Sequence, residues 1–440
     1  MKFRIHTNLR FTIISVAVYA CLVGSVQANF GLNPYLSGLS DSGASAAVQD
    51  DNASISFLNP AGLAQIKGNQ WTAPLFTYRT SISFNNQGSK DTLDIPTTGN
   101  ANKQNLLTII PSFYYAQPLN QKMNIGFSVN SPFGLTSEYD DNWIGRYHAI
   151  KTSIETVTLT TSLGYKLSEH WSTGLGINVQ KTQTELSSAL DFGSICLSIL
   201  DTSTCSSLGM PAPQSADGKV EHITNDWGLG FTIGGLWKKN DTRLGFAYRS
   251  KIEHNLKGKA KFSTPTSAFS PAFTNTDVEV ELTLPEIFAL NIQHDITNQF
   301  SLAAGTTLTR WSRIKKLTLN YANALQEDQT VPKNWKDVWR TALGIHYRIR
   351  PNWKISGGIA YENSNIPNET FEPGIPTSDA TWLNAGIKYQ WKNTMSLDIA
   401  WNHVFFDKRK LSQTSAFGDT LSGDIDLELD VLLIQFNWEH

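Results

Sequence analysis

Very short and much longer polar connections alternate strictly along this chain. The short turns lie at residues 119–122, 168–170, 238–241, 297–299, 350–352 and 392–393. The longer loops lie roughly at residues 85–103, 139–147, 188–221, 263–276, 321–333, 363–376 and 410–422. Short turns at one end of the strands and long loops at the other are typical of bacterial outer-membrane β-barrels, and the spacing predicts about fourteen strands.

Between these connections, apolar and polar residues alternate with a period of two. Val157, Leu159 and Leu163, for example, alternate with Thr156 and Thr158. A soluble sandwich would bury such an apolar face, whereas a membrane barrel exposes it to lipid and lines its lumen with the polar face. Beyond the N-terminal region no stretch approaches the roughly eighteen apolar residues of a membrane helix. We therefore predict an all-β fold, a fourteen-stranded antiparallel transmembrane β-barrel over residues 69–440.

Aromatic residues cluster around the short turns. Tyr165, Trp237, Tyr347 and Tyr389 each lie shortly before one of them. This placement indicates an aromatic girdle at one membrane interface, although aromatic residues are also common in ordinary strands.

The last predicted strand ends in alternating apolar residues, as the C-terminal strand of an outer-membrane barrel does. Glu439 and His440 follow, however, where an aromatic residue would usually end the chain. The alternation shifts between Val431 and Leu433, where a β-bulge would fit.

Residues 44–64 have a different composition, rich in Ala, Ser, Asn and Asp, with Asn59, Pro60 and Ala61 at their centre. Pro60 disfavours helical backbone at Asn59 and removes one backbone donor, so the chain turns there. A segment with so few large apolar residues cannot form a core of its own. We therefore predict that residues 29–68 form a hatch that plugs the barrel lumen.

The N-terminus has the pattern of an export signal. Lys2, Arg4 and Arg10 precede an apolar run at residues 11–26, and a small-residue cleavage site follows. We expect residues 1–28 to be a signal peptide. The alternative, a lipoprotein anchored at Cys21, is less well supported because the apolar run continues past that residue.

Export also predicts the state of the remaining cysteines and the charge of the mature chain. Cys196 and Cys205 lie in a Ser/Thr-rich loop, and an oxidising periplasm would let them form a disulfide, the alternative being two free thiols. Without residues 1–28, 33 basic and 38 acidic residues remain, a net charge of −5. This net charge does not indicate the basic surface that binding to nucleic acid requires.

Several stretches, in this order, resemble the FadL family of outer-membrane transporters for long-chain fatty acids and other hydrophobic compounds. Residues 50–64 are similar to the hatch of that family, and residues 130–135 to its interrupted third strand. Weaker matches lie at residues 143–147, 284–286, 311–312, 335–340 and 375–376. The resemblance implies a monomeric barrel that binds its substrate in a lumenal pocket and releases it sideways into the outer membrane of a Gram-negative bacterium.

The interrupted strand also follows from the residues themselves. Pro132 and Gly134 flank Phe133 within what periodicity predicts as one wall strand, residues 123–139. Proline cannot donate to a β-ladder, and a closed barrel has no edge strand to hold it. We therefore expect local loss of pairing and an inward kink at this point, which would leave a lateral gap; the alternative is a bulge with a purely structural role.

The resemblance also suggests ligand-binding residues. Phe30 and Leu32 match the family's N-terminal residues that enter the pocket, although such a terminus is often unanchored. A fatty acid needs a cation for its carboxylate, and the family's lysine falls on Thr318, so Lys316, two residues earlier on the same strand face, is the substitute. Lys316 would otherwise be a solvated rim residue, and a neutral aromatic hydrocarbon is the alternative substrate.

We expect no enzyme, no cofactor and no metal site. The nine histidines form no metal-ligand pair, and the sequence contains no GxSxG, HExxH or phosphate loop. An outer-membrane hydrolase is the least supported alternative. The expected partners are a fatty acid or another hydrophobic small molecule, and the lipid and lipopolysaccharide of the outer membrane.

Overall fold

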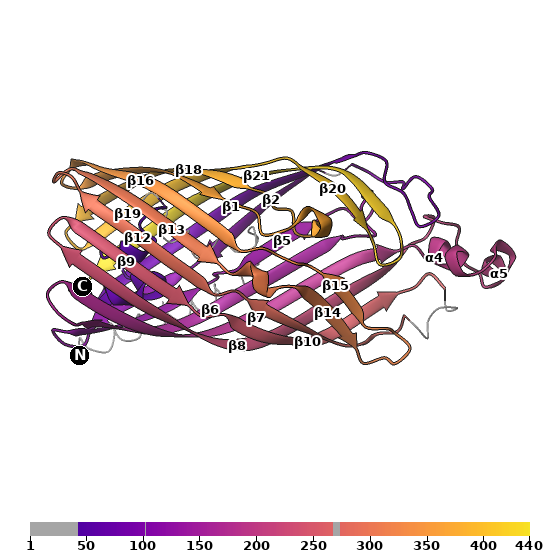
Figure 1. The fold of residues 1–440 in the computed structure, drawn as a ribbon, viewed down its shortest axis with the longest axis horizontal. Helices are drawn as coiled ribbons and strands as arrows, with labels where there is room; N and C mark the ends of the chain where they lie inside the picture. The colour runs from indigo at the N-terminus through magenta and orange to yellow at the C-terminus, as the bar shows by residue number, and fades with distance from the viewer. Residues whose placement is uncertain (1–42, 102, 267–272) are drawn as a thin grey trace, which may run out of the picture.

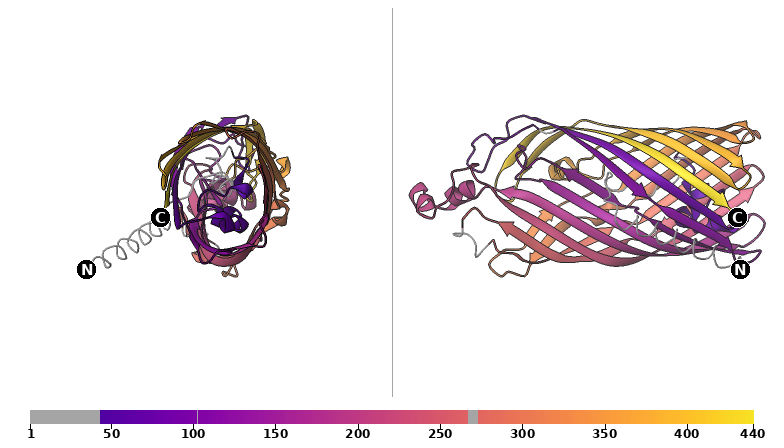
Figure 2. Two further views of the ribbon diagram at one scale, coloured as in Figure 1. Left: turned by 90° about the vertical axis from the view of Figure 1, so that its left-hand side faces the viewer. Right: turned by 180° about the vertical axis from the view of Figure 1, so that it is seen from behind.

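A computed structural model describes residues 43–101, 103–266 and 273–440. Its strands form one antiparallel sheet that closes into a barrel (Figures 1 and 2). Twenty-one strand segments combine into fourteen wall strands, because seven of the wall strands are each divided in two by a short interruption. The predicted fourteen-stranded all-β barrel is confirmed. The predicted signal peptide, residues 1–28, and residues 29–42 of the predicted hatch lie outside the described residues.

Seven wall strands are continuous: β1 (Gln70–Asn86), β6 (Lys151–Lys166), β7 (Trp171–Leu190), β8 (Gly218–Lys239), β17 (Trp353–Glu362), β18 (Ala380–Lys392) and β21 (Thr420–Glu439). The divided wall strands are β2 (Lys103–Pro111) with β3 (Phe113–Pro118), β4 (Met123–Asn130) with β5 (Gly134–Glu138), β9 (Thr242–Arg249) with β10 (Ile252–Ser263), β11 (Thr276–Leu284) with β12 (Ile287–Asp295), β13 (Phe300–Thr309) with β14 (Lys316–Tyr321), β15 (Gln329–Pro332) with β16 (Val338–Arg350), and β19 (Met395–Phe406) with β20 (Arg409–Thr414).

The helices are short. The N-terminal segment contains η2 (Ala46–Val48), α3 (Ile55–Leu58) and η3 (Pro60–Gln65), and the loops contain α4 (Phe192–Ile199), α5 (Thr202–Ser207), η5 (Trp311–Arg313) and η6 (Asn368–Thr370). Within the described ranges, no helix has the length and apolar character needed to cross a membrane.

The first and last strands close the barrel. β1 pairs with β21 from Gln70 opposite Glu439 to Asn86 opposite Gly423. The predicted short turns join wall strands at the end that carries the C-terminus, and the long loops lie at the other end with α4 and α5 (Figure 1). Short turns mark the periplasmic end of such barrels, so α4 and α5 are extracellular.

The outer face of the wall is apolar. Large side chains such as Leu107, Ile177 and Leu343 are exposed there, as lipid-facing residues are. Rings also gather at the periplasmic end, where Trp353 and Tyr389 lie 4.4 Å apart between centroids. The aromatic clustering around the short turns therefore forms an interfacial belt.

The inner face carries polar side chains that bond to one another across strands. Gln180 on β7 donates to the Thr158 hydroxyl of β6 at 2.8 Å, and Thr182 lies 3.0 Å from His254 Nε2 on β10. These groups are buried, because side chains fill the narrow lumen. Polar residues that alternate along the sequence thus find hydrogen-bond partners on neighbouring strands within the barrel.

The bulge considered between Val431 and Leu433 is absent, because β21 keeps an unshifted register with β1 through this region. Val431 and Leu433 are buried on the lumenal side, while Leu432 between them faces outward. The inner wall is itself apolar here, since both residues belong to a buried cluster with Phe76 and Tyr78 of β1. Because apolar residues lie on both faces of the strand here, the sequence shows no apolar–polar alternation although the strand is regular.

Candidate functional site

The N-terminal segment lies inside the barrel near its periplasmic end, within the ring of strands (Figure 2, left). Asn59 is fully buried at its centre and holds two parts of it together. Its Nδ2 donates to the carbonyl oxygens of Ala47, at 2.7 Å, and of Gly235 in β8, at 3.2 Å. Its Oδ1 accepts from the Ala61 amide at 3.2 Å, at the point where Pro60 begins η3. The segment is thus joined directly to the wall.

Glycines in the wall make room for this segment, which we call the hatch (residues 43–66). A Cβ built on Gly174 would lie 2.2 Å from the carbonyl carbon of Pro60, and one on Gly234 would lie 1.9 Å from Asn59 Oδ1. Neither position admits a side chain. The same applies to Gly126, where a Cβ would lie 2.5 Å from Ser56 Cβ.

Wall side chains also bind the backbone of the hatch. The Ser172 hydroxyl donates to the Ala61 carbonyl at 2.9 Å, and Asn124 Nδ2 donates to the Leu63 carbonyl at 2.6 Å. Arg249 of β9 donates to the Phe57 carbonyl at 2.6 Å, and its guanidinium lies 3.5 Å from the centre of the Phe57 ring. These bonds satisfy backbone groups that a segment without a sheet of its own would leave unpaired.

The third wall strand is interrupted between β4 and β5. Asn130 is opposite Thr158 of β6 and Gly134 is opposite Glu155. The third strand therefore advances four residues where β6 advances three, so it contains one extra residue. The extra residue displaces the chain from the ladder, as in a β-bulge. Pro132 and Phe133 are buried, and the Phe133 ring lies 5.9 Å from that of Trp311 in the lumen. The interruption therefore turns inward.

Thr156 of β6 stabilises the interruption. Its hydroxyl accepts a hydrogen bond from the Phe133 amide at 3.0 Å and donates one to the Phe133 carbonyl. One side chain thus satisfies both backbone groups of a residue that has left the ladder.

Above the interruption, the edge of β5 has no ladder partner on one side. β4 pairs with β3 and β6, whereas β5 pairs with β6 and, among the described residues, forms no ladder with β2. Near its end the Glu138 amide is bound by a side chain, Gln104 Oε1 of β2, at 3.2 Å. The wall therefore has a lateral break between β2 and β5.

Two small cavities lie on the lumenal side of this break. One is lined by Phe57 of the hatch, by Phe76 and Tyr78 of β1, and by Pro132 of the interruption. The second lies along β1 and β5, with Ile82, Leu135, Phe406 and Leu427 among its lining residues. Apolar side chains dominate both. They follow β1 past the interruption and supply an apolar surface next to the break in the wall.

Aromatic residues close the lumen on the extracellular side. Trp143, Trp311 and Trp335 are almost fully buried in one large apolar cluster that also contains Phe133 and Leu135. The Trp311 and Trp335 rings are 5.4 Å apart between centroids and nearly perpendicular. Because Phe133 belongs to this cluster, the extracellular closure and the interrupted strand are in direct contact.

Of the predicted ligand-binding residues, the structure describes only Lys316. Phe30 and Leu32 lie outside the described residues. Lys316 is exposed at the first residue of β14, opposite Pro332, while Leu317 and Leu319 on the alternate face contact the buried apolar cluster. Lys316 is thus not part of the buried apolar cluster that Leu317 and Leu319 contact.

Sequence reasoning missed a buried cation in the lumen. Arg340 of β16 is 7% exposed, donates to the Gly43 carbonyl at 3.0 Å, and lies 5.5 Å from the centre of the Trp382 ring. Trp382 belongs to the lumenal apolar cluster that includes Val404 and Leu429. Its sequence signals were its place in the family match at residues 335–340 and its position in the period-two alternation of β16.

The predicted disulfide is present. Cys196 on α4 and Cys205 on α5 are bonded, with their Cα atoms 6.0 Å apart. Asp191 and Asp201 cap the two helices by accepting hydrogen bonds from backbone amides in the first turn. The bond therefore fastens α5, in which only Cys205 is buried, to the better packed α4.

A second extracellular loop contains a shielded histidine. His148 follows β5, and its Nε2 is inaccessible to solvent. Burial lowers the pKa of His148 to about 4, against the opposing effect of a hydrogen bond with Gln413. The ring is therefore neutral at physiological pH.

The sequence and the fold were compared with those of known proteins. Residues 23–439 match the family described as outer membrane protein transport protein (OMPP1/FadL/TodX). The chain is 26% identical to the long-chain fatty acid transport protein of Escherichia coli O6:H1 over 92% of this chain and 93% of that protein. It is also 26% identical to outer membrane protein P1 of Haemophilus influenzae over 88% and 87% of the two chains.

Two solved structures share the fold. A FadL homologue of Pseudomonas aeruginosa superposes with a TM-score of 0.81 at 24% identity, over 94% of this chain and all of that one. The toluene transporter TbuX of Ralstonia pickettii superposes with a TM-score of 0.64 at 20% identity, over 93% and 98%. The chain therefore belongs to the OMPP1/FadL/TodX family of outer membrane transport proteins, whose members are transporters and not enzymes.

Proposed function

We propose that this protein takes up long-chain fatty acids across the outer membrane by binding them in the lumen and releasing them sideways through the break between β2 and β5. The observation that carries the proposal is the unpaired edge of β5 beside two apolar cavities. Unpaired backbone groups facing lipid cost several kcal/mol each, so a break in a transmembrane wall needs something to cover it. A hydrophobic ligand passing there would not have to cross water.

A buried cation supports an acidic substrate. A carboxylate within the lumen must be paired, because an isolated buried charge is costly. Arg340 lies beside the apolar cluster of Trp382, Val404 and Leu429, and Glu362 is opposite it in the register. Relatives over most of the chain are named as fatty acid transport proteins, which points in the same direction.

One observation favours a neutral hydrocarbon instead. Among the described residues, no charged side chain lines either cavity beside the break. Similar solved structures include channels named for toluene and for monoaromatic hydrocarbons, at identities that carry the fold alone. A substrate without a carboxylate would need no partner in these cavities.

Uptake by cells that carry the gene separates the two substrates. We expect radiolabelled oleate to accumulate, and Arg340→Gln to lower its uptake by about tenfold while toluene uptake stays unchanged. Arg340→Lys, which keeps the charge, should restore part of the loss. Lys316→Ala tests the sequence prediction in the same assay. Toluene uptake without oleate uptake would favour the neutral substrate, and equal losses of both in Arg340→Gln would make Arg340 a structural residue.

A further inference from the structure

Asn130, the last residue of β4, is a buried amide without a hydrogen-bond partner. It is 4% exposed, and neither its Nδ2 nor its Oδ1 is bonded to a described residue. Thr158, its neighbour in the register, is instead bonded to Gln180 of β7. Within the part of the chain that the structure describes, no other buried amide side chain lacks partners at both ends. Such groups are rare in folded proteins, because a buried polar atom without a partner lowers stability.

The amide lines the first of the two cavities beside the break in the wall. The other lining residues are mostly apolar and include Phe57 of the hatch, Phe76 of β1, Ile110 of β2 and Pro132 of the interruption. The cavity has a volume of about 10 Å³, which is close to the space that a single water molecule needs. It therefore fits the polar end of a ligand, and an attached alkyl chain must lie outside it, along the break.

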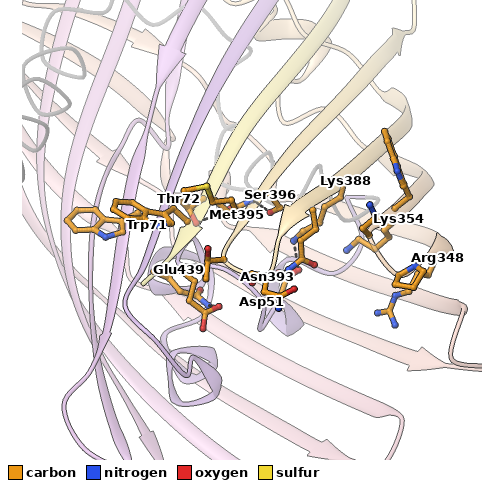
Figure 3. A pocket seen from close by; sticks show the side chains of 18 residues that line it. Asp51, Trp71, Thr72, Arg348, Lys354, Lys388, Asn393, Met395, Ser396 and Glu439 are labelled. Carbon is orange, nitrogen blue, oxygen red and sulfur yellow. Dashed lines mark hydrogen bonds and ion pairs between the residues drawn. The ribbon is translucent and has the colours of Figure 1, made fainter.

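Charged side chains line a different cavity, at the periplasmic mouth of the barrel. There the Asp51 carboxylate of the hatch lies 2.8 Å from Lys388 Nζ, and Lys354 and Arg348 lie beyond them along the wall (Figure 3). The cavity beside Asn130 has, among the described residues, no charged side chain in its lining. An ionised head group would lose its hydration there without gaining a counterion, which is costly.

The neighbours of this cavity do not change its character. Arg249 donates to the Phe57 carbonyl and lies 3.5 Å from the centre of the Phe57 ring, but it is not one of the lining residues. The lining side chains that can ionise are the phenols of Tyr78 and Tyr114, which are neutral at physiological pH. The chemistry of the cavity therefore selects an uncharged group.

We infer that Asn130 binds the polar end of a hydrophobic ligand at the break, and that this end is an uncharged group that both donates and accepts hydrogen bonds. A hydroxyl or a protonated carboxyl is such a group, since the amide Nδ2 donates to its oxygen and the amide Oδ1 accepts from its O–H. A carboxylate offers no donor to Oδ1, and a hydrocarbon offers neither donor nor acceptor.

The inference rests on the proposed lateral route, to which it adds a residue and a protonation state. A fatty acid that has taken up a proton from water leaves the barrel as the neutral acid, which enters lipid without burying a charge. A long-chain alcohol has the same hydrogen-bonding chemistry and needs no proton.

Binding of short amphiphiles to the purified full chain in a non-ionic detergent tests the site. Asn130→Leu removes both hydrogen-bonding atoms and should weaken binding of 1-octanol by about tenfold, while octanoate binding at about pH 8 stays unchanged. Octanoic acid at about pH 5, where part of it is protonated, should respond as octanol does. A response of octanol alone identifies a hydroxyl site and excludes the protonated acid. Each variant is compared with the wild type at the same pH.

The melting temperature distinguishes a ligand-binding amide from a structural one. Asn130→Leu should melt at or above the temperature of the wild type, because it removes an unpaired polar group. Asn178 of β7 provides the matched control, since it is also buried on the inner wall but donates to the Thr232 hydroxyl at 3.0 Å and accepts from the Thr160 hydroxyl at 2.8 Å. Asn178→Leu should melt at a lower temperature and bind octanol as the wild type does.

Two results overturn the inference. One is octanol binding that neither Asn130→Leu nor Asn130→Ala weakens, which would mean that the amide meets only water. The other is a melting temperature that falls in both variants as far as in Asn178→Leu; Asn130→Ala adds no volume and so decides the question if leucine does not fit. The proposed function is tested separately, because cells that take up no oleate refute it whatever octanol does, and normal uptake with unchanged octanol binding refutes this inference alone.

Discussion

Gly234 of β8 lies so close to Asn59 of the hatch that a Cβ on Gly234 would be 1.9 Å from Asn59 Oδ1. Any side chain at residue 234 must push the hatch away from the wall. The next residue provides a control, because a Cβ on Gly235 would meet nothing within 4 Å. Comparing substitutions at these two neighbouring glycines thus distinguishes the effect of a clash with the hatch from the general effect of replacing glycine in a strand.

We predict that Gly234→Ala loosens the hatch and that Gly235→Ala does not. Overpacking of this kind costs about 1–3 kcal/mol, which corresponds to roughly a 5- to 150-fold shift in an opening equilibrium. Hydrogen exchange of the amides in residues 43–66 measures that shift directly. Equal protection in the two variants would mean that Gly234 does not restrain the hatch.

Much of the wall could be predicted from the sequence because turn spacing and period-two alternation are local patterns. The fourteen strands and the turn positions follow from them, whereas the disulfide of Cys196 and Cys205 follows from the expected export to an oxidising periplasm. The alternation failed at Val431 and Leu433, where the lumen is as apolar as the membrane. A period of two cannot tell the two faces apart when both exclude water.

The sites depend on contacts that no local pattern contains. Asn130 of β4 and Phe76 of β1 line one cavity only because the sheet curves into a barrel. Gly126 and Gly174 lie close to the hatch only because the barrel is closed around it. Lys316 shows the same limit, since its strand face was inferred from an alignment with a family lysine.

Thr156 gives a prediction for the interruption. Thr156→Val removes the hydroxyl that binds both the amide and the carbonyl of Phe133. Leaving these buried groups unsatisfied should lower the free energy of unfolding by about 1–3 kcal/mol. Denaturant unfolding followed by tryptophan fluorescence measures the change, and Thr156→Ser, which retains the hydroxyl, should stay near the wild type. A neutral effect of Thr156→Val would assign the stability of the interruption to Phe133 packing alone.

His148 predicts a pH dependence of the extracellular loops. Its pKa is about 4 in the folded protein, below the ordinary value of 6.5, so the unfolded state takes up the proton first as pH falls. The contribution of His148 to the free energy of unfolding is therefore fully present above about pH 6.5, and up to about 3 kcal/mol of it is lost as the pH falls to about 4. Melting temperatures of the wild type and His148→Gln should diverge from pH 8 to pH 4. Parallel curves would show that His148 contributes nothing to the dependence.

The lateral break between β2 and β5 is tested most directly by closing it. Substitutions alone cannot close the break, because the third wall strand would still have four residue steps opposite three on β6. The variant therefore combines deletion of Ser131 with Pro132→Val. Asn130 and Gly134 are then three residue steps apart, as Thr158 and Glu155 are on β6. The repaired strand can then pair along its whole length. Deleting a residue from the exposed turn at 119–122 controls for the shortened chain.

The deciding measurement is oleate uptake by cells with equal amounts of each variant in the outer membrane, alongside oleate binding by the purified proteins. We predict that the closed variant loses uptake by at least about tenfold and still binds oleate, because the lumen is intact while the exit is sealed. Normal uptake by a folded, inserted variant whose strand is continuous would contradict lateral release.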